Sequence, residues 1–221
     1  MQDVRVAPSI LAADFSRLGE QMESVMDAGA RVIHVDVMDG HFVPPISIGA
    51  LVVESIRDQV HGAGGVLDVH LMVERPERRI DDFAQAGADS IAVHWEATPD
   101  VHYALKAVRD AGLNAGLAIN PGTPPDEVAG LAGSYDHLLC MTVNPGWGGQ
   151  PYIESSTDKV GRLRELLPDG MPIEVDGGID ADTAARCAQA GATLFVAGSS
   201  IFGADQPAEA YAAIAQATGA A

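Results

Sequence analysis

Histidines and aspartates recur near the ends of three apolar segments, with a spacing that suits metal binding. His34 and Asp36 lie in the segment IHVDVMDG, His70 lies in LDVHLM and Asp176 lies in IEVDGG. Side chains alternate along a strand, so residues two apart, such as His34 and Asp36, share one face. Two buried carboxylates side by side would be costly without a cation. If the strands end at one place, we expect these four residues to hold one divalent cation per subunit. Mixed nitrogen and oxygen ligands suit Zn²⁺, Fe²⁺, Mn²⁺ or Co²⁺ and do not choose among them.

Two further acidic residues are predicted to support the histidines from deeper in the strands. Asp68 and Glu174 precede His70 and Asp176 by two positions, and therefore share their faces. A histidine that binds a metal usually donates its other ring N–H to a carboxylate or carbonyl. His94 also stands at a predicted strand end, where we expect a packed or hydrogen-bonded barrel residue. The remaining histidines are predicted to be loop or surface residues: His41, His61, His102 and His137.

Glycines follow two of the apolar segments in a way that suits a phosphate group. Gly177 and Gly178 come directly after one segment, and Gly198 and Ser199 come after the last. Glycine lets a ligand approach the backbone closely, and free N–H groups supply donors without a cationic side chain. Barrels often bind phosphate with the loops after strands seven and eight.

A third glycine-rich segment, NPGWGGQ at 144–150, surrounds one large aromatic residue. Gly146, Gly148 and Gly149 flank Trp147. This composition predicts a loop that moves and covers a ligand with an apolar lid. The alternative is a rigid turn whose tryptophan packs on the rim.

A phrase containing Ala-Gly precedes four of the apolar segments. It reads DAGA at 27–30, QAGA at 85–88, DAGL at 110–113 and QAGA at 189–192. Each fits a helix end with a left-handed glycine, followed by a short strand. Strands that are apolar on both faces indicate a parallel sheet covered by helices. We predict eight strands, near 4–10, 31–37, 66–72, 90–95, 114–119, 137–143, 171–176 and 193–197. Helices are predicted between them, for example over 15–28, 48–60 and 153–167.

Eight strand–helix units in 221 residues predict a single domain, 1–221, with an α/β fold of the (β/α)8 TIM-barrel type. An open Rossmann-like sheet is the alternative. In a barrel the carboxyl ends of the strands meet at one mouth, where functional side chains gather. That arrangement would bring the predicted metal ligands and the glycine loops together.

Charge and composition narrow the class of protein. The net charge of −18 argues against nucleic acid and against an anionic membrane as partners. A phosphate would therefore have to be bound locally, by backbone N–H groups. No apolar run is long enough for a membrane span, and the first residues lack the pattern of a secretory signal. Cys140 and Cys187 have no metal-type spacing and are expected to be free thiols of a cytoplasmic protein.

Six stretches of the sequence, in chain order from the first strand to the last, resemble the ribulose-phosphate 3-epimerase family. They are APSIL at 7–11, HVDVMDGHFVP at 34–44, DVHLM at 68–72, NPGWGGQ at 144–150, EVDGGI at 174–179 and GSSIF at 198–202. The set is far more specific than any one stretch, and it covers the whole predicted domain. Departures are small: Trp147 stands where the family commonly has Phe, and Pro45 where Asn is common.

The resemblance implies roles for named residues. The metal ligands would be His34, Asp36, His70 and Asp176, with Asp36 and Asp176 as the acid/base pair. The implied substrate contacts are Ser9, His70, Gly146, Trp147, Gly148, Gly149, Asp176, Gly177, Gly178, Gly198 and Ser199. Met38, Met72 and Met141 would line the cavity of the intermediate, although methionines at such positions are as often ordinary core residues. Family members are homo-oligomers, and we expect the same here.

The implied reaction interconverts D-ribulose 5-phosphate and D-xylulose 5-phosphate. Inversion of a carbon next to a ketone requires one base to remove a proton and another to return one on the opposite face. Asp36 and Asp176 would flank a planar enediolate, and the metal would stabilise its oxyanion as a Lewis acid.

Three other interpretations are open. The nearest is a 3-epimerase of a hexulose phosphate such as allulose 6-phosphate. A phosphate-binding lyase is more distant, because decarboxylases of the orotidine-phosphate type and Schiff-base aldolases need a strand lysine. Lys106 and Lys159 both fall in predicted helices. A non-catalytic metal or phosphate sensor would need no acid/base pair.

Overall fold

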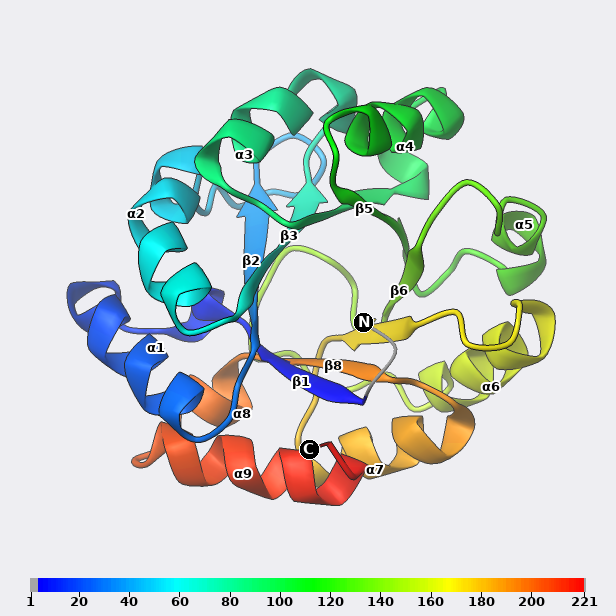
Figure 1. The fold of residues 1–221 in the computed structure, drawn as a ribbon. Coiled ribbons are helices and arrows are strands. Elements are labelled where there is room, and N and C mark those ends of the chain that lie inside the picture. The colour runs from blue at the N-terminus through cyan, green and yellow to red at the C-terminus, as the bar shows by residue number, and fades with distance from the viewer. Residues whose placement is uncertain (1–3, 221) are drawn as a thin grey trace.

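The strands of the computed structural model, which describes residues 4–220, form one parallel barrel (Figure 1). Their bounds are β1 (Arg5–Pro8), β2 (Val32–Met38), β3 (Val66–Met72), β4 (Ser90–His94), β5 (Asn114–Ile119), β6 (His137–Met141), β7 (Ile173–Asp176) and β8 (Leu194–Ala197). The order in the 8-stranded sheet is β1-β8-β7-β6-β5-β4-β3-β2. A parallel bridge from Ser9, just after β1, to His34 in β2 joins the two ends of this sheet. The (β/α)8 prediction is confirmed, and the open-sheet alternative is wrong.

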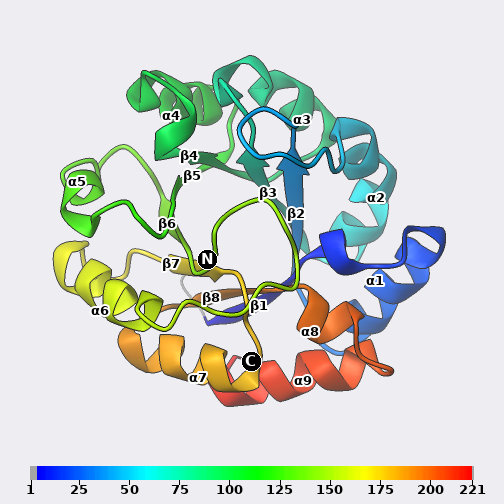
Figure 2. The ribbon, with the colours of Figure 1, turned by 180° about the vertical axis from the view of Figure 1, so that it is seen from behind.

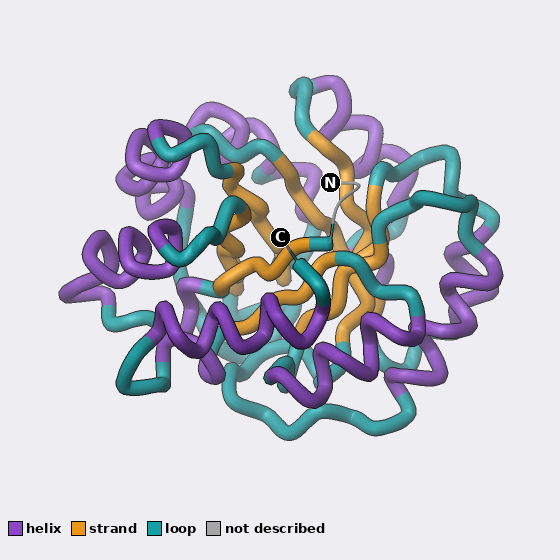
Figure 3. Tube along the Cα trace, turned by 60° about the horizontal axis from the view of Figure 1, so that its bottom comes forward, coloured by secondary structure: helices purple, strands orange, loops and turns teal. Residues whose placement is uncertain are grey.

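Helices form a ring around the barrel, with the strands inside it (Figure 3). Their bounds are α1 (Leu18–Asp27), α2 (Ala50–Gly62), α3 (Ile80–Ala86), α4 (Val101–Asp110), α5 (Pro125–Ala129), α6 (Ser156–Leu166), α7 (Ala181–Ala190), α8 (Ser199–Phe202) and α9 (Pro207–Thr218). Within residues 4–220, no helix combines the length and the apolar character that a bilayer crossing requires.

Strand alternation divides each strand between two environments. In β2, Ile33, Val35 and Val37 pack outward in the main apolar core beneath the helices. His34 and Asp36 lie between them in sequence and face the inside of the barrel, where both are buried. Each buried aliphatic side chain contributes about 1.5–3 kcal/mol relative to exposure. The outward residues therefore hold the strand in a register that keeps the polar residues inside.

The recurring Ala-Gly phrase ends helices as predicted. Gly29, Gly87, Gly112 and Gly191 all have positive φ, between 81° and 115°. Gly87 and Gly191 are the left-handed caps of α3 and α7, and their N–H groups donate to the last turn of the helix. The phrase thus marks the point at which the chain turns from the helical layer back into the barrel.

Several element ends differ from the prediction by a few residues. The first strand stops at Pro8 because the Ser9 side chain accepts a hydrogen bond from Leu11 N and caps a 3-10 turn over Ile10–Ala12. The predicted helix over 15–28 begins as a 3-10 turn, Phe15–Arg17, before α1. The helix predicted from 153 starts at Ser156.

His137 was predicted to be a loop or surface residue, and this prediction is wrong. It opens β6, is 1% exposed and faces the barrel interior, with Nε2 3.4 Å from Glu174 Oε2. Gly116 pairs with it in β5, and a Cβ at that position would collide with the His137 ring. The neighbouring strand therefore gives the imidazole its space by having no side chain there.

We predict that Gly116→Ala lowers the free energy of unfolding by about 1–3 kcal/mol, the usual cost of overpacking. The added methyl would meet the His137 ring and would also lie 2.8 Å from Ala92 Cβ. Urea denaturation measures the loss. Gly161→Ala in α6 is the control, because nothing lies within 4 Å of its Cβ position. A helical alanine there should stabilise by roughly 0.5–1 kcal/mol. Unchanged stability of Gly116→Ala would contradict the crowding.

Candidate functional site

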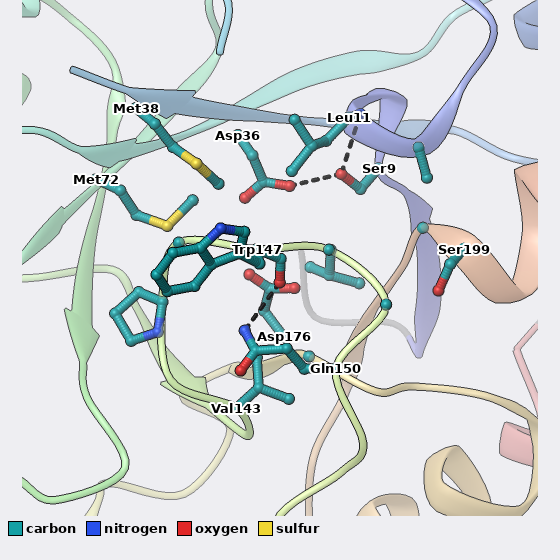
Figure 4. A pocket seen from close by; sticks show the side chains of 18 of the residues that line it. Ser9, Leu11, Asp36, Met38, Met72, Val143, Trp147, Gln150, Asp176 and Ser199 are labelled. Atoms are coloured by element: carbon teal, nitrogen blue, oxygen red, sulfur yellow. Dashed lines mark hydrogen bonds between the residues drawn. The ribbon is translucent and has the colours of Figure 1, made fainter. Parts of the chain in front are cut away.

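A pocket of about 490 Å³ opens at the carboxyl ends of the strands (Figure 4). This volume is in the range of small-molecule sites. Most of the predicted substrate contacts line it: Ser9, Gly146, Trp147, Gly148, Gly149, Asp176, Gly177, Gly178, Gly198 and Ser199. Met38, Met72 and Met141 line it as well. His70 does not line the pocket, because it is fully buried behind the two aspartates.

The four predicted metal ligands meet beneath this pocket. One ligand atom from each of His34, Asp36, His70 and Asp176 lies within 4.8 Å of the others. His70 Nδ1 is 3.1 Å from Asp36 Oδ1 and 3.4 Å from Asp176 Oδ2. His34 Nε2 is 3.3 Å from Asp36 Oδ1. Both imidazoles are fully buried, while the two carboxylates keep slight contact with solvent through the pocket.

His34 is oriented from below by two carboxylates, as predicted. Its Nδ1 lies 2.8 Å from Asp68 Oδ2 and 3.3 Å from Glu174 Oε1. A carboxylate accepts hydrogen bonds, so this contact keeps a proton on Nδ1 and leaves Nε2 as the nitrogen that can bind a cation. That Nε2 is buried and has no hydrogen-bond partner among the described residues.

The metal prediction therefore fits the residues that are present. A buried imidazole nitrogen with no partner is costly unless something binds it. Here it is aimed at a group of nitrogen and oxygen atoms close enough for one cation to reach all of them. This donor set suits Zn²⁺, Fe²⁺, Mn²⁺ or Co²⁺.

The other imidazole, His70, is held by a second histidine. His70 Nε2 lies 2.9 Å from His94 Nε2, and the two rings stack with centroids 5.0 Å apart. His94 Nδ1 lies 3.1 Å from Glu96 Oε2. His94 is thus a hydrogen-bonded barrel residue, as predicted. Its connection to His70 was not predicted, because the link depends on pairing between strands that one sequence does not reveal.

Burial and charge separate the pKa values of the two aspartates. Burial raises the pKa of Asp176, and the nearby negative charge of Asp36 raises it further. Burial acts in the same direction on Asp36, but His34 and His70 outweigh it and hold the pKa of Asp36 well below its ordinary value. Carboxyl groups with unequal proton affinities in one cleft are typical of acid/base sites.

Two serines fix the position of Asp36. Ser9 Oγ donates to Asp36 Oδ2 at 2.5 Å. Ser47 Oγ donates to the Asp36 carbonyl at 2.7 Å and accepts from Met38 N at 2.8 Å. Ser47 was missed by the sequence analysis, although it lies shortly after the stretch 34–44. Other lining residues without a predicted role are Leu11, Ala12, Pro45, Ile46, Val143, Pro145, Gln150, Ile179 and Val196.

The loop at 144–150 lies over the pocket, and the chain between β6 and α6 arches across the barrel end (Figure 2). Gln150 Nε2 donates to the carbonyls of Asn144 and Trp147, at 2.6 and 2.9 Å. Trp147 lines the pocket and is 57% exposed. Its indole ring lies across the pocket in Figure 4.

The glycines after β7 are required by the backbone. Gly177 and Gly178 have φ of 119° and 65°. A Cβ on Gly178 would lie 2.6 Å from Tyr152 N. Among residues 4–220, those that line the pocket include no lysine or arginine. The donors that this lining offers to an anion are therefore uncharged: backbone N–H groups, hydroxyls, and the N–H groups of Gln150 and Trp147.

Comparisons with known proteins agree with this geometry. The family model described as "Ribulose-phosphate 3 epimerase family" matches residues 5–202. Ribulose-phosphate 3-epimerase of Bacillus subtilis is 45% identical over 204 residues, 90% of this chain and 93% of the relative. The protein of that name from Synechocystis is 47% identical over 218 residues, 96% of this chain and 94% of the relative.

Solved structures with lower identity share the fold. KGPDC from Streptococcus mutans in complex with D-R5P has a TM-score of 0.77 at 18% identity, over 99% of this chain and 98% of that chain. Orotidine 5′-phosphate decarboxylase from Pyrococcus horikoshii has a TM-score of 0.72 at 18% identity, over 96% and 98%. At such low identities, these matches show a shared architecture only. The family match and the close relatives carry more: this chain belongs to the ribulose-phosphate 3-epimerase family and is an isomerase.

Proposed function

We propose that this isomerase interconverts D-ribulose 5-phosphate and D-xylulose 5-phosphate by proton transfer at C3, with Asp36 and Asp176 as the two bases beside a bound divalent cation. One observation carries the proposal: carboxylates from β2 and β7 enter the same pocket from opposite sides (Figure 4). The substrate follows from the relatives, which are named ribulose-phosphate 3-epimerases.

Each aspartate acts as base in one direction and as acid in the other. Asp36 accepts from the Ser9 hydroxyl, and this hydrogen bond together with a bound cation would keep it ionised and ready to accept a proton. Without the cation, burial and the negative charge of Asp36 raise the pKa of Asp176; a bound cation would favour its ionised form as well. A planar enediolate between them would receive a proton from either face. The family resemblance assigns the same pair.

His34, Asp36, His70 and Asp176 would hold the cation. A divalent cation there supplies positive charge to the oxyanion that develops at the substrate, an effect worth several kcal/mol. Of the four, the two histidines are the fixed part of the set, because both are fully buried and hydrogen-bonded on their other ring nitrogen. The two aspartates must serve both the cation and the proton.

The phosphate would bind at the opposite end of the pocket, against Gly177, Gly178, Gly198 and Ser199. The support is the donor chemistry of backbone N–H groups, in a pocket whose described lining carries no cationic side chain. Met38, Met72, Met141 and Trp147 would cover the reacting carbon with apolar surface. Excluding water there strengthens the charge interactions and leaves the two aspartates as the groups that exchange protons with the enediolate.

We predict that Asp36→Asn and Asp176→Asn each lower the exchange of the C3 proton with solvent by at least about 10²–10⁴-fold, the usual contribution of a general acid or base. Deuterium incorporation from D₂O, followed by NMR on each substrate, measures this exchange. Asp205→Asn is the control, because it removes the same charge from an exposed position. Normal exchange in both site variants would refute the two-base assignment.

Removal of the metal should abolish activity. A strong chelator followed by gel filtration is expected to reduce kcat to background, and titration with Zn²⁺, Fe²⁺, Mn²⁺ or Co²⁺ should restore it at one ion per subunit. Metal analysis of the purified protein identifies the native ion. Full activity in a preparation free of metal would contradict the metal requirement.

The substrate class is tested by three ketoses in one assay series. D-Ribulose lacks the phosphate, and we expect its kcat/KM to be at least about 100-fold lower than that of D-ribulose 5-phosphate, because the binding energy of the phosphate is lost. Allulose 6-phosphate separates the pentulose from the hexulose assignment. A higher kcat/KM with allulose 6-phosphate would reassign the enzyme to the hexulose phosphate.

A further inference from the structure

The outer nitrogen of His70 makes an unusual contact for a candidate metal ligand. Such a histidine generally donates its second N–H to a carboxylate, a carbonyl or water. His70 Nε2 instead faces another imidazole nitrogen, His94 Nε2, at 2.9 Å. Two ring nitrogens at this distance share one hydrogen, so one of them must carry a proton and the other a lone pair.

Glu96 decides which nitrogen carries it. One of its carboxylate oxygens, Oε1, accepts from Asn120 N at 2.8 Å and from the Thr123 hydroxyl. The other, Oε2, lies 3.1 Å from His94 Nδ1. Burial raises the pKa of Glu96, but the hydrogen bonds from His94, Thr123 and Asn120 outweigh burial and hold it below its ordinary value. An ionised carboxylate only accepts, so His94 Nδ1 must donate.

The remaining protons follow in sequence. With its proton on Nδ1, a neutral His94 presents a lone pair at Nε2. His70 then donates from its own Nε2, and when the ring is neutral, as a metal ligand must be, its Nδ1 carries the lone pair. That Nδ1 is the atom 3.1 Å from Asp36 and 3.4 Å from Asp176. With a cation bound, the chain of contacts therefore leaves the unprotonated nitrogen of His70 facing it.

We infer that Glu96, acting through His94, is a positioning residue that fixes the tautomer and ring orientation of His70 for metal binding. The inference rests on the proposed metal site. His94 in β4 and Glu96 in the turn after it would therefore affect the reaction without touching the substrate, because neither residue lines the pocket.

His34 provides an internal comparison. Its Nδ1 reaches the Asp68 carboxylate directly at 2.8 Å. His70 reaches the Glu96 carboxylate through one intervening ring. Each histidine thus has its tautomer set by an acidic residue on its far side. For His70 that acidic residue is Glu96. It follows β4 and is held by hydrogen bonds from Asn120 and Thr123, in the chain after β5.

Glu96→Gln is the sharpest variant because it preserves the shape and reverses the donor. Asn120 N and the Thr123 hydroxyl both need an acceptor at the position of Oε1, so the oxygen of the new amide is expected there. The amide NH₂ would then face His94 Nδ1 and donate to it. This would move the His94 proton to Nε2 and the His70 proton to Nδ1, against the cation.

We expect Glu96→Gln to weaken Zn²⁺ binding by about 10- to 100-fold, the usual effect of removing the partner of a metal-bound histidine. Metal-free protein is titrated with Zn²⁺ in competition with a chromophoric chelator. Glu127→Gln is the matched control, because it removes one exposed carboxylate from α5 in the adjoining strand–helix unit. His94→Gln should retain most of the affinity, since an amide can donate to Glu96 and accept from His70 at once.

Long-range ¹H–¹⁵N NMR of the histidine rings reads the tautomers directly and does not depend on any variant folding. Wild-type protein loaded with Zn²⁺ should show His94 protonated at Nδ1 and His70 at Nε2. His94 protonated at Nε2 in the wild type, or Glu96→Gln binding Zn²⁺ as tightly as the wild type, would overturn the inference alone. Wild-type protein that binds no Zn²⁺ at this site would overturn the proposed metal site together with it.

Discussion

The arrangement of the barrel mouth depends on two buried carboxylates that lie within reach of one imidazole. Asp36 and Asp176 both approach His70 Nδ1, and both have lost most of their water. Bringing two negative charges this close is unfavourable unless positive charge compensates them. Two features of the site lower that cost: the Ser9 hydroxyl, which donates to Asp36, and a position that a cation can occupy. The acid/base role proposed for the pair has the same origin as this cost, because groups that compete for one proton are also able to pass it on.

Polar side chains lie at more than one depth on the inner face of the barrel. The deepest polar layer contains Asp68, Glu174 and His137, all of them buried. In the register of β2 and β3, His34 pairs with Asp68 and His70 pairs with Asp36, and the two aspartates and the methionines line the pocket. Charge therefore continues well below the mouth. A barrel interior of this kind depends on the apolar outer faces of the strands for its stability, because the main aliphatic core lies between strands and helices and not along the axis.

Much of this arrangement could be predicted from the sequence because alternation along a strand is a local rule. Once β2 is recognised, His34 and Asp36 must share a face, and the same rule applies to Asp68 with His70. The rule fails where a strand's start is ambiguous. His137 is the first residue of the strand predicted over 137–143, where a polar residue resembles the end of a loop, although Leu139 on the same face is buried. Alternation also does not reveal which residues are neighbours across strands. The contact between His70 and His94 could therefore be found only from the register of the strands in the structure.

The closure of the barrel between β1 and β2 affects how the chain folds during its synthesis. β1 pairs with β8, and Ser9 both bridges to β2 and donates to Asp36. A ribosome adds about 5–20 residues per second, so β1 waits roughly 10 to 40 s for residues 194–197 to be synthesised. Until then the nascent sheet has two open edges, which invite wrong pairing. Completion of the last strand closes the ring, and only then does the full set of site residues surround the pocket.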